Sequence, residues 1–517
     1  MNLRGSKTFT ILSLTLVLLI VGLAVNNFSA KTASKEEITI GINTIARTLD
    51  PNATEGSPEF RVAANIFDPL VRRSAEGKLE PALATSWSRK DLKTWSFQLR
   101  KGVEYHNGND FTAADVAYTF ERVQDPTKTE VAFISKLVEE IRTVGKYEIE
   151  IETKDPVPYF VNQLAHLYIL DKQSSEARSK GEIANDPIGT GPYEVVEWTR
   201  GQEIIFEADE NYWGEKPEVK KVVYREIADA MTRVAALFGG EIDILLGVPV
   251  ELFDKVKNRS GIKTIKTPSR RIIYLGLSGR KGFPTANTKV RKALYMAINE
   301  QEIVEKIMNG LAIPASQMFD KHMTGYNSEI ERLQYDPEKA KELLAEAGYP
   351  EGFEITLDST NDRYMNDAQI AEAVVRYWQK IGIDAELAAR TASQHGPLVA
   401  NHNTNCYLLG WSESSYSGLA LLSSMFHTPE EGYGTWNGGD YSNELLDTFI
   451  ESGSKILNNN LRREYVEWVN KYAMKELVVY IPLHYQVDLY AVREEAGVSF
   501  PARPDKWLLF NEIEVTS

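Results

Sequence analysis

The residues best suited to chemistry in this 517-residue chain are aromatic rings. They crowd the segment 411–441, which is also rich in Gly, Ser and Asn: Trp411, Tyr416, Phe426, Tyr433, Trp436 and Tyr441. Large amphipathic rings combined with adaptable polar groups are what a pocket for a small polar molecule needs. The segment as a set therefore predicts a binding site, although any single ring could equally belong to an ordinary core.

Motifs of catalytic centres do not occur in the sequence. It has no G-x-S-x-G, no H-E-x-x-H and no P-loop. His402 and Cys406 lie four residues apart and could share a helix face as metal ligands. A buried thiol near an exposed histidine is the preferred interpretation of that pair. We therefore expect a protein that is not an enzyme, with no catalytic residue, no metal site and no cofactor.

Composition narrows the class of protein further. The chain has 58 basic and 73 acidic residues, a formal charge of −15, so it lacks the basic footprint that nucleic acids require. Its one cysteine, Cys406, cannot form an intrachain disulfide or a cysteine-based metal cluster. Hydrophobic residues make up 43% and charged residues 25% of the chain. These values are typical of a soluble globular protein, here long enough for two or three lobes.

The N-terminal 1–30 segment has the pattern of a secretory signal peptide. Arg4 and Lys7 precede an apolar run over 11–25, which is shorter than the ~20 residues that a spanning helix needs. Cleavage is expected after Ala24 or Ala30, and an uncleaved N-terminal anchor is the alternative. Because no cysteine follows at the end of the run, a lipidated cysteine anchor is excluded. We expect an exported, soluble, periplasmic protein that is not a lipoprotein.

Strand-like runs alternate with capped helices along the rest of the chain. Strands are predicted over 38–42, 95–99, 147–152, 353–357 and 383–387, and helices are predicted to start at Thr112, Asn299, Asp336 and Asn366. Between the last two strands, Ile370, Val374, Trp378 and Ile381 recur at helical spacing. This strand–helix–strand unit predicts a parallel sheet covered by helices, and hence an α/β fold.

Eight stretches, in order along the chain, then carry a family resemblance. They are LEPALATSW (79–87), TWSFQLRKGVEYHNGNDFTAADVAYTFERV (94–123), DPIGTGPYEVVEW (186–198), NYWGEKP (211–217), VRKALYMAIN (290–299), YDPEKAKELLAEAGYP (335–350), YSNELLD (441–447) and IPLH (481–484). With them the chain resembles the extracytoplasmic solute-binding proteins of ABC transporters, family 5, the peptide/opine/nickel type.

The resemblance implies a two-lobed periplasmic-binding-protein-like fold, with hinged lobes of mixed sheets covered by helices. The first lobe would comprise 36–272, with an extra subdomain at about 70–187. The second lobe would comprise 273–488, and the segment 489–517 would return to the first lobe. Two crossovers near 271–275 and 485–489 would form the hinge. Gly189 and Gly191 are expected to serve turn geometry.

The resemblance also implies which residues meet the ligand. Dipeptide and oligopeptide binders of this family place an aspartate three residues after a Gly-Trp pair, where it grips the free amine of the peptide. Here Gly410–Trp411 is followed by Ser414 at that position, and Glu413 comes one residue early. In an extended strand Ser412 and Ser414 would share one face, and Arg363 would meet a ligand carboxylate. The candidate ligand-binding residues are Tyr274, Arg363, Trp411, Ser412, Glu413, Ser414, Trp436 and Asn437.

The predicted function is that of the solute-binding component of an ABC importer. It would capture a peptide or peptide-like small molecule between its lobes and deliver it, as a monomer, to the permease subunits in the membrane. An oligosaccharide binder of the same fold is one alternative, and a secreted hydrolase without a known motif is another. A nickel or metal-chelate binder is weaker, because few histidines fall in the expected cleft segments.

Overall fold

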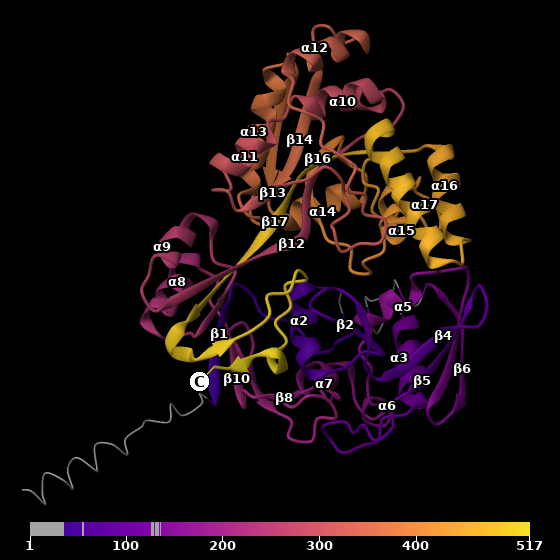
Figure 1. The fold of residues 1–517 in the computed structure, drawn as a ribbon, viewed down its shortest axis with the longest axis vertical. Helices are drawn as coiled ribbons and strands as arrows, with labels where there is room; N and C mark the ends of the chain where they lie inside the picture. Colours follow the sequence, from indigo (N-terminus) through magenta and orange to yellow (C-terminus); the bar gives the residue numbers. More distant parts are fainter. Residues whose placement is uncertain (1–35, 54–55, 126–128, 130–133, 135, 517) are drawn as a thin grey trace, which may run out of the picture.

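In the computed structural model the chain forms two lobes joined by two long strands (Figure 1). The structure describes residues 36–516 apart from 54–55, 126–128, 130–133 and 135. The predicted signal peptide therefore lies outside the described residues. Within the described part of the chain, no helix is both long and apolar enough to cross a membrane.

One half of the large sheet belongs to the first lobe, the lower one in Figure 1. Strand β1 pairs in parallel with β10 and β11, and β9 and β8 continue the sheet antiparallel. Ile38 and Ile40 of β1 are fully buried in a core that the helix α2 covers. The elements are β1 (Glu37–Ile42), α2 (Ser57–Ile66), β8 (Tyr193–Thr199), β9 (Glu203–Ala208), β10 (Lys221–Glu226), α8 (Ala230–Gly239), β11 (Ile244–Leu246), η2 (Val250–Leu252) and α9 (Phe253–Lys257).

A second sheet forms the other side of this lobe and has a core of its own. Its strand order is β4-β5-β7-β6, all antiparallel, and α3 contributes to its core. α3 begins after Thr112, as predicted, and Thr112 and Asp115 form a capping box there. The elements are β2 (Val71–Arg73), β3 (Leu79–Pro81), β4 (Ala84–Arg89), β5 (Thr94–Leu99), α3 (Ala113–Gln124), β6 (Val138–Gly145), β7 (Glu148–Thr153), α5 (Phe160–Gln163), η1 (Leu164–His166), α6 (Lys172–Glu176) and α7 (Lys180–Asn185).

Two glycines fix how α2 meets the start of β8. A Cβ on Gly189 would lie 1.9 Å from the carbonyl oxygen of Ile66, and a Cβ on Gly191 would lie 2.4 Å from the Ile66 carbonyl carbon. The Gly191 amide donates to that same oxygen at 2.9 Å. Close backbone approach therefore requires glycine at both positions, in agreement with the structural role predicted for them.

The second lobe, at the top of Figure 1, contains the predicted strand–helix–strand unit. Strands β14 and β15 pair in parallel over their full length, and α13 joins them. Trp378 of α13 is completely buried, and its indole donates to the carbonyl of Leu294 at 3.0 Å. The elements are η3 (Pro284–Ala286), α10 (Thr288–Met296), α11 (Glu300–Lys306), β13 (Ala312–Pro314), α12 (Pro337–Glu346), β14 (Glu354–Thr360), α13 (Asp367–Gln379), β15 (Asp384–Arg390), α14 (Ala392–Ala400) and β16 (Cys406–Trp411).

The predicted caps of these helices are confirmed except for one. Asn299 and Asp336 accept hydrogen bonds from the first turns of α11 and α12, as predicted. Asn366 makes no cap bond at the start of α13 and instead donates to the carbonyl of Ile307. That cap prediction was wrong because Asn366 has φ 55°, outside the extended region that a capping side chain needs.

A helical layer covers the other side of the second lobe, beside α5 and β4 of the first lobe in Figure 1. It consists of α15 (Gly418–Leu421), the π-helical turn η4 (Leu422–Phe426), α16 (Glu444–Ser454), α17 (Asn459–Lys471) and the π-helical turn η5 (Tyr472–Leu477). Phe426, Leu446 and Val469 are among the residues of this layer that fill its core.

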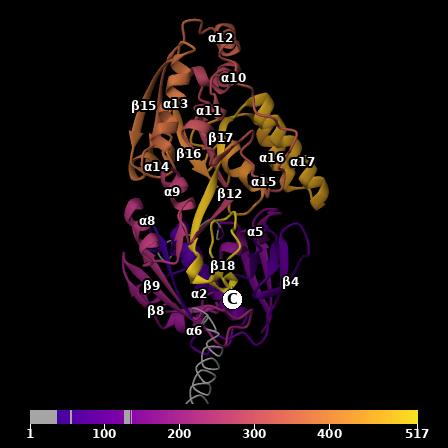
Figure 2. The same cartoon turned by 60° about the vertical axis from the view of Figure 1, so that its left-hand side comes forward.

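The strands β12 (Ile262–Leu277) and β17 (Tyr480–Arg493) run from one lobe to the other (Figures 1 and 2). They pair antiparallel, and the register shifts between Pro268 and Ile272. Because β17 also pairs with β11 and β12 also pairs with β16, one sheet is continuous through both lobes. The C-terminal segment, yellow in Figure 1, returns to the first lobe with η6 (Glu494–Ala496), β18 (Val498–Ser499), η7 (Phe510–Glu512) and β19 (Glu514–Val515).

Candidate functional site

The lobes contact each other at the turn 413–416, which follows β16 in the second lobe. Arg73 Nη2 donates to the carbonyl of Ser415 at 2.7 Å, and Asn162 Nδ2 donates to the same oxygen at 2.9 Å. The imidazole Nε2 of His166 lies 3.2 Å from the carbonyl of Ser414. Three polar side chains of the first lobe thus bind backbone carbonyls of the second lobe at this turn.

Tyr416 stands between two arginines at this contact. Its ring lies 4.1 Å from the guanidinium carbon of Arg73 and 3.3 Å from that of Arg270. Tyr416 has φ 58° and is buried, and a Cβ on Gly77 would lie 2.4 Å from its ring. Cation–π contacts with both arginines therefore hold the ring at the contact between the lobes.

Arg270, on the crossover strand β12, forms a buried ion pair beside Tyr416. Its Nε lies 2.9 Å from Oδ2 of Asp320, and both side chains are buried. Its Nη2 donates to the carbonyl of Glu413 at 2.5 Å. Arg270 therefore joins the crossover to the turn with its charge balanced.

The extended strand that was predicted beyond Trp411 does not form. β16 ends at Trp411, and residues 414–415 form a turn. The prediction that Ser412 and Ser414 share a strand face was therefore wrong. Ser412 is exposed and Ser414 is half-buried. The cause is local, because the carboxylate of Glu413 accepts from the amide of Ser415 at 3.1 Å and from its hydroxyl at 2.8 Å.

Glu413 is turned inward by the same bonds. It is buried, and its negative charge acts on Arg73 and on Tyr159. One of its oxygens is occupied by Ser415. A carboxylate thus lies inside the contact between the lobes, although the aspartate of peptide binders is absent from position 414.

Trp411 and Trp436 form an aromatic pair next to this turn. Their rings lie 5.1 Å apart, and Trp436 remains 45% exposed. Such a partly open indole surface can receive an apolar or sugar-like part of a ligand. Of the sequence-predicted residues, this pair, Ser412, Ser414 and Arg363 have surface available to a ligand.

Arg363 lies in the loop between β14 and α13, and its exposed side chain packs on Tyr364 at 5.4 Å from the ring. Tyr364 donates its hydroxyl to the carbonyl of Gly410 at 3.2 Å. Arg271 of β12 packs on the same ring at 5.8 Å. The ring of Tyr364 thereby places two guanidinium groups close to the end of β16.

Tyr274 and Asn437 have buried side chains. Tyr274 is completely buried against Tyr407 and Tyr480, with ring centroids 6.2 and 5.2 Å away. Asn437 is 1% exposed, and its amide bonds the carbonyls of His427 and Tyr441 and the amide of Tyr441. Both side chains are buried among partners within the second lobe.

Other residues at the crossover were not found by sequence reasoning. Lys506 Nζ lies 2.6 Å from Oδ1 of Asp488, and Arg271 and Arg61 act electrostatically on this pair. These residues belong to the helix α2, the two crossover strands and the C-terminal segment. They share no motif, because only the fold brings them together.

The free energy of unfolding should depend on pH through His166. Burial, together with the nearby charge of Arg73, lowers the pKa of His166 to about 4, and its ring packs against Phe60 and Trp507. The folded protein therefore keeps this ring neutral while the unfolded chain takes up a proton below pH 6.5. The stability it contributes is present above pH 6.5 and is lost as the pH falls toward 4, by about 3 kcal/mol.

The variant His166→Gln is expected to flatten this part of the pH profile, because glutamine can still donate to Ser414 but does not titrate. Urea unfolding of both proteins at pH 7 and at pH 4.5 measures the difference. An identical loss of unfolding free energy in both proteins would contradict the assignment.

One group of side chains in the described part of the chain has the composition of a metal site. Donor atoms of His427, Glu430 and Glu451 lie within 4.8 Å of one another. Hydrogen bonds already engage both imidazole nitrogens, since Nδ1 lies 2.8 Å from the carbonyl of Thr428 and Nε2 lies 3.4 Å from Glu451. His402 and Cys406 do not share a helix, because β16 begins at Cys406, and His402 instead pairs with Asp440 at 2.7 Å.

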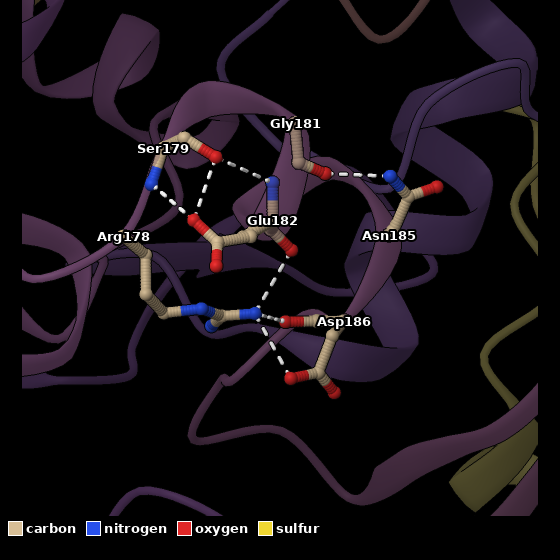
Figure 3. A pocket seen from close by; sticks show the side chains of 6 residues that line it. All are labelled: Arg178, Ser179, Gly181, Glu182, Asn185 and Asp186. Atoms are coloured by element: carbon tan, nitrogen blue, oxygen red, sulfur yellow. Dashed lines mark hydrogen bonds and ion pairs between the residues drawn. The ribbon is translucent and has the colours of Figure 1, made fainter.

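A surface hollow of about 340 Å³ surrounds α7 in the first lobe (Figure 3). Its polar groups bond one another: Ser179 and Glu182 form a capping box, and Arg178 binds the carbonyl of Glu182 and the carboxylate of Asp186 at 2.8 and 2.9 Å. These bonds account for the polar lining, and we assign it no ligand.

Comparison with known proteins places this architecture in a family. Residues 78–433 match the model for bacterial extracellular solute-binding proteins, family 5 (middle). The glutathione-binding protein GsiB of Escherichia coli O1:K1 / APEC is 28% identical over 452 residues, which cover 85% of this chain and 87% of that protein.

Solved structures have the same two-lobed fold. The periplasmic binding protein DppA of Helicobacter pylori, in complex with the peptide STSA, is similar with a TM-score of 0.79 and 25% identity, over 93% of this chain and 98% of that one. HbpA2 of Haemophilus parasuis has a TM-score of 0.82 at 22% identity, over 93% of this chain and 100% of that one. The prediction from the sequence motifs is confirmed, and the chain belongs to the bacterial extracellular solute-binding proteins of family 5.

Proposed function

We propose that the protein captures a peptide or peptide-like molecule between its lobes and delivers it to the permease of an ABC importer. The observation that carries the proposal is the arrangement at the crossover. Arg363 and the Trp411–Trp436 pair of the second lobe remain accessible beside strands that join the two lobes. Capture by closure around a ligand is the behaviour that two hinged lobes allow.

The relatives support a peptide-like ligand. GsiB is named for binding glutathione, and the DppA structure contains a peptide. In this proposal Arg363 meets a ligand carboxylate, Trp411 and Trp436 cover its apolar parts, and Ser412, Glu413 and Ser414 border the site. The protein acts by binding alone, as an exported soluble monomer without a cofactor.

An oligosaccharide ligand is the second candidate, and the exposed indole of Trp436 is the observation that favours it. Sugars stack on such rings. The guanidinium groups of Arg363 and Arg271, which both pack on Tyr364, favour a carboxylate instead. We therefore retain the peptide-like ligand as the first choice.

Closure on binding tests this function. Protein purified without unfolding is analysed by native mass spectrometry for a bound small molecule, and its X-ray scattering is compared with that of protein stripped by unfolding and refolding. We expect the occupied form to have the smaller radius of gyration. At a hundredfold excess over Kd, the added solute should stabilise the fold by about 2.7 kcal/mol. A bound solute that leaves the scattering curve unchanged would contradict capture by closure.

A further inference from the structure

Four basic side chains from separate parts of the chain meet at the crossover between the lobes. Arg61 belongs to α2 and Lys506 to the C-terminal segment of the first lobe, Arg271 to the crossover strand β12, and Arg363 to the second lobe. Arg271 interacts electrostatically with both Arg61 and Arg363, and Lys506 interacts with both Arg61 and Arg271. We call these four residues the basic cluster.

The carboxylate of Asp488 acts on both Arg271 and Lys506. Asp488 on β17 pairs with Lys506 at 2.6 Å and also attracts Arg271. Asp488 is buried, and its second oxygen has no hydrogen-bond partner among the described residues. Among the described residues, Lys506 alone of the four forms an ion pair with an acid, so the cluster keeps an excess of positive charge.

Two arginines close to these residues in the sequence have acidic partners of their own. Arg270, the residue next to Arg271, has the buried Asp320 at 2.9 Å. Arg503 has Asp505 and Glu512 at 2.9 and 3.1 Å. Arg270 and Arg503 thus have their own acids, whereas Lys506 alone of the basic cluster forms an ion pair with an acid among the described residues.

An excess of charge between two lobes has an energetic consequence. Like charges that are removed from water repel strongly unless an anion lies among them. Arg271 and Lys506 are only half-exposed, and burial lowers the pKa of both. Because the four groups come from both lobes and from the strand that joins them, an anion at this place would attract both lobes at once.

The chemistry of the groups indicates which anion fits. A guanidinium presents a planar fork that pairs both oxygens of a carboxylate. Tyr364 supports two of these forks, with Arg363 and Arg271 at 5.4 and 5.8 Å from its ring. Lys506 and Arg61 offer further positive charge from the first lobe. The positive charge of the cluster is therefore greater than the single terminal carboxylate of a neutral peptide can neutralise.

Resting on the proposed function, we infer that the ligand is an acidic, peptide-like molecule with at least two carboxylate groups, and that the basic cluster of Arg61, Arg271, Arg363 and Lys506 is its specificity determinant. The anion neutralises repulsion between the lobes as they close. The free oxygen of Asp488 is then available to an amine of the same ligand.

Two pools of tripeptides that differ only in side-chain charge test this inference. Thermal unfolding of the mature protein, stripped by refolding, is followed with Glu-Xaa-Glu and with Gln-Xaa-Gln, Xaa being varied equally in both. We expect the Glu pool to raise the melting temperature and the Gln pool to need an at least tenfold higher concentration for half of the maximal shift, roughly the effect of one lost charge pair. Equal effects of the pools, a preference for the Gln pool, or no shift with either pool would overturn the inference.

Variants show whether the basic cluster is responsible. Arg61→Gln and Lys506→Gln should each raise the half-maximal concentration of the Glu pool at least about tenfold. Arg142→Gln removes an exposed arginine on β6, far from the crossover, and should leave that concentration unchanged. The melting temperature without peptide is recorded for each protein, so that weaker binding is separated from a weaker fold. Unchanged affinity of Arg61→Gln would overturn the role of the cluster.

The identity of the bound molecule and the closure of the lobes are measured separately. A neutral or cationic molecule found by native mass spectrometry, which closes the lobes in solution scattering, overturns the acidic ligand and leaves the importer function intact. An N-acetylated Glu-Xaa-Glu pool, which keeps the carboxylates but has no free amine, tests whether the protein recognises the amine of the ligand. Weaker binding of that pool than of the free-amine pool is expected if Asp488 receives the ligand amine, and equal binding would overturn that part.

Discussion

Replacing Arg270 by alanine is expected to lower the free energy of unfolding by about 3–5 kcal/mol, because it leaves Asp320 buried without its counter-charge. The two groups lie 2.9 Å apart, and each side chain is nearly excluded from solvent. The variant also loses the guanidinium that lies 3.3 Å from the ring of Tyr416 and the bond to the carbonyl of Glu413. Urea unfolding followed by tryptophan fluorescence measures the change.

The next residue provides a matched control for this prediction. Arg271→Ala removes the same side chain from the adjacent position of β12, where the group faces other cations. It should change the unfolding free energy by less than about 1 kcal/mol while it weakens binding of the Glu-Xaa-Glu pool. The double variant Arg270→Met, Asp320→Leu should recover much of the stability, because it removes both charges together. Equal stability of Arg270→Ala and the wild type would contradict the structural role of this pair.

Local signals in the sequence were sufficient for much of the fold. The capping box of Thr112 and Asp115 and the caps at Asn299 and Asp336 involve residues two or three positions apart, so propensity and geometry act within one turn. The helix α13 was predicted from its apolar spacing, and its flanking strands pair in parallel as expected. Patterns of this kind need no knowledge of distant parts of the chain.

The candidate site was harder to predict, because it depends on a turn and on distant contacts. The sequence pattern predicts that the strand continues beyond Trp411. In the structure the strand ends at Trp411, and the side chain of Glu413 bonds Ser415 in the turn that follows. A carboxylate two residues before a serine is a local turn signal that could have been recognised. The approach of Arg61, Arg271 and Lys506 had no such signal, since they come together only when α2, the crossover and the C-terminal segment are assembled.

Arg363→Ala is expected to weaken binding of the Glu-Xaa-Glu pool by about 2–5 kcal/mol, because closure would leave a ligand carboxylate in the cleft without its partner. Arg363→Lys should not restore full affinity, since a single ammonium cannot form the two-pronged contact. The loss should appear in the concentration for half-maximal thermal shift.

The free protein should unfold as before in both Arg363 variants, because the side chain is exposed in the structure and an exposed group contributes little to the fold. Arg376→Ala removes another exposed arginine, from α13 of the same lobe, and it should change neither affinity nor stability. If Arg363→Ala binds the pool as tightly as the wild type does, Arg363 is a surface residue of the second lobe that does not bind the ligand. The carboxylate must then be held by Arg271, the other guanidinium that packs on this ring.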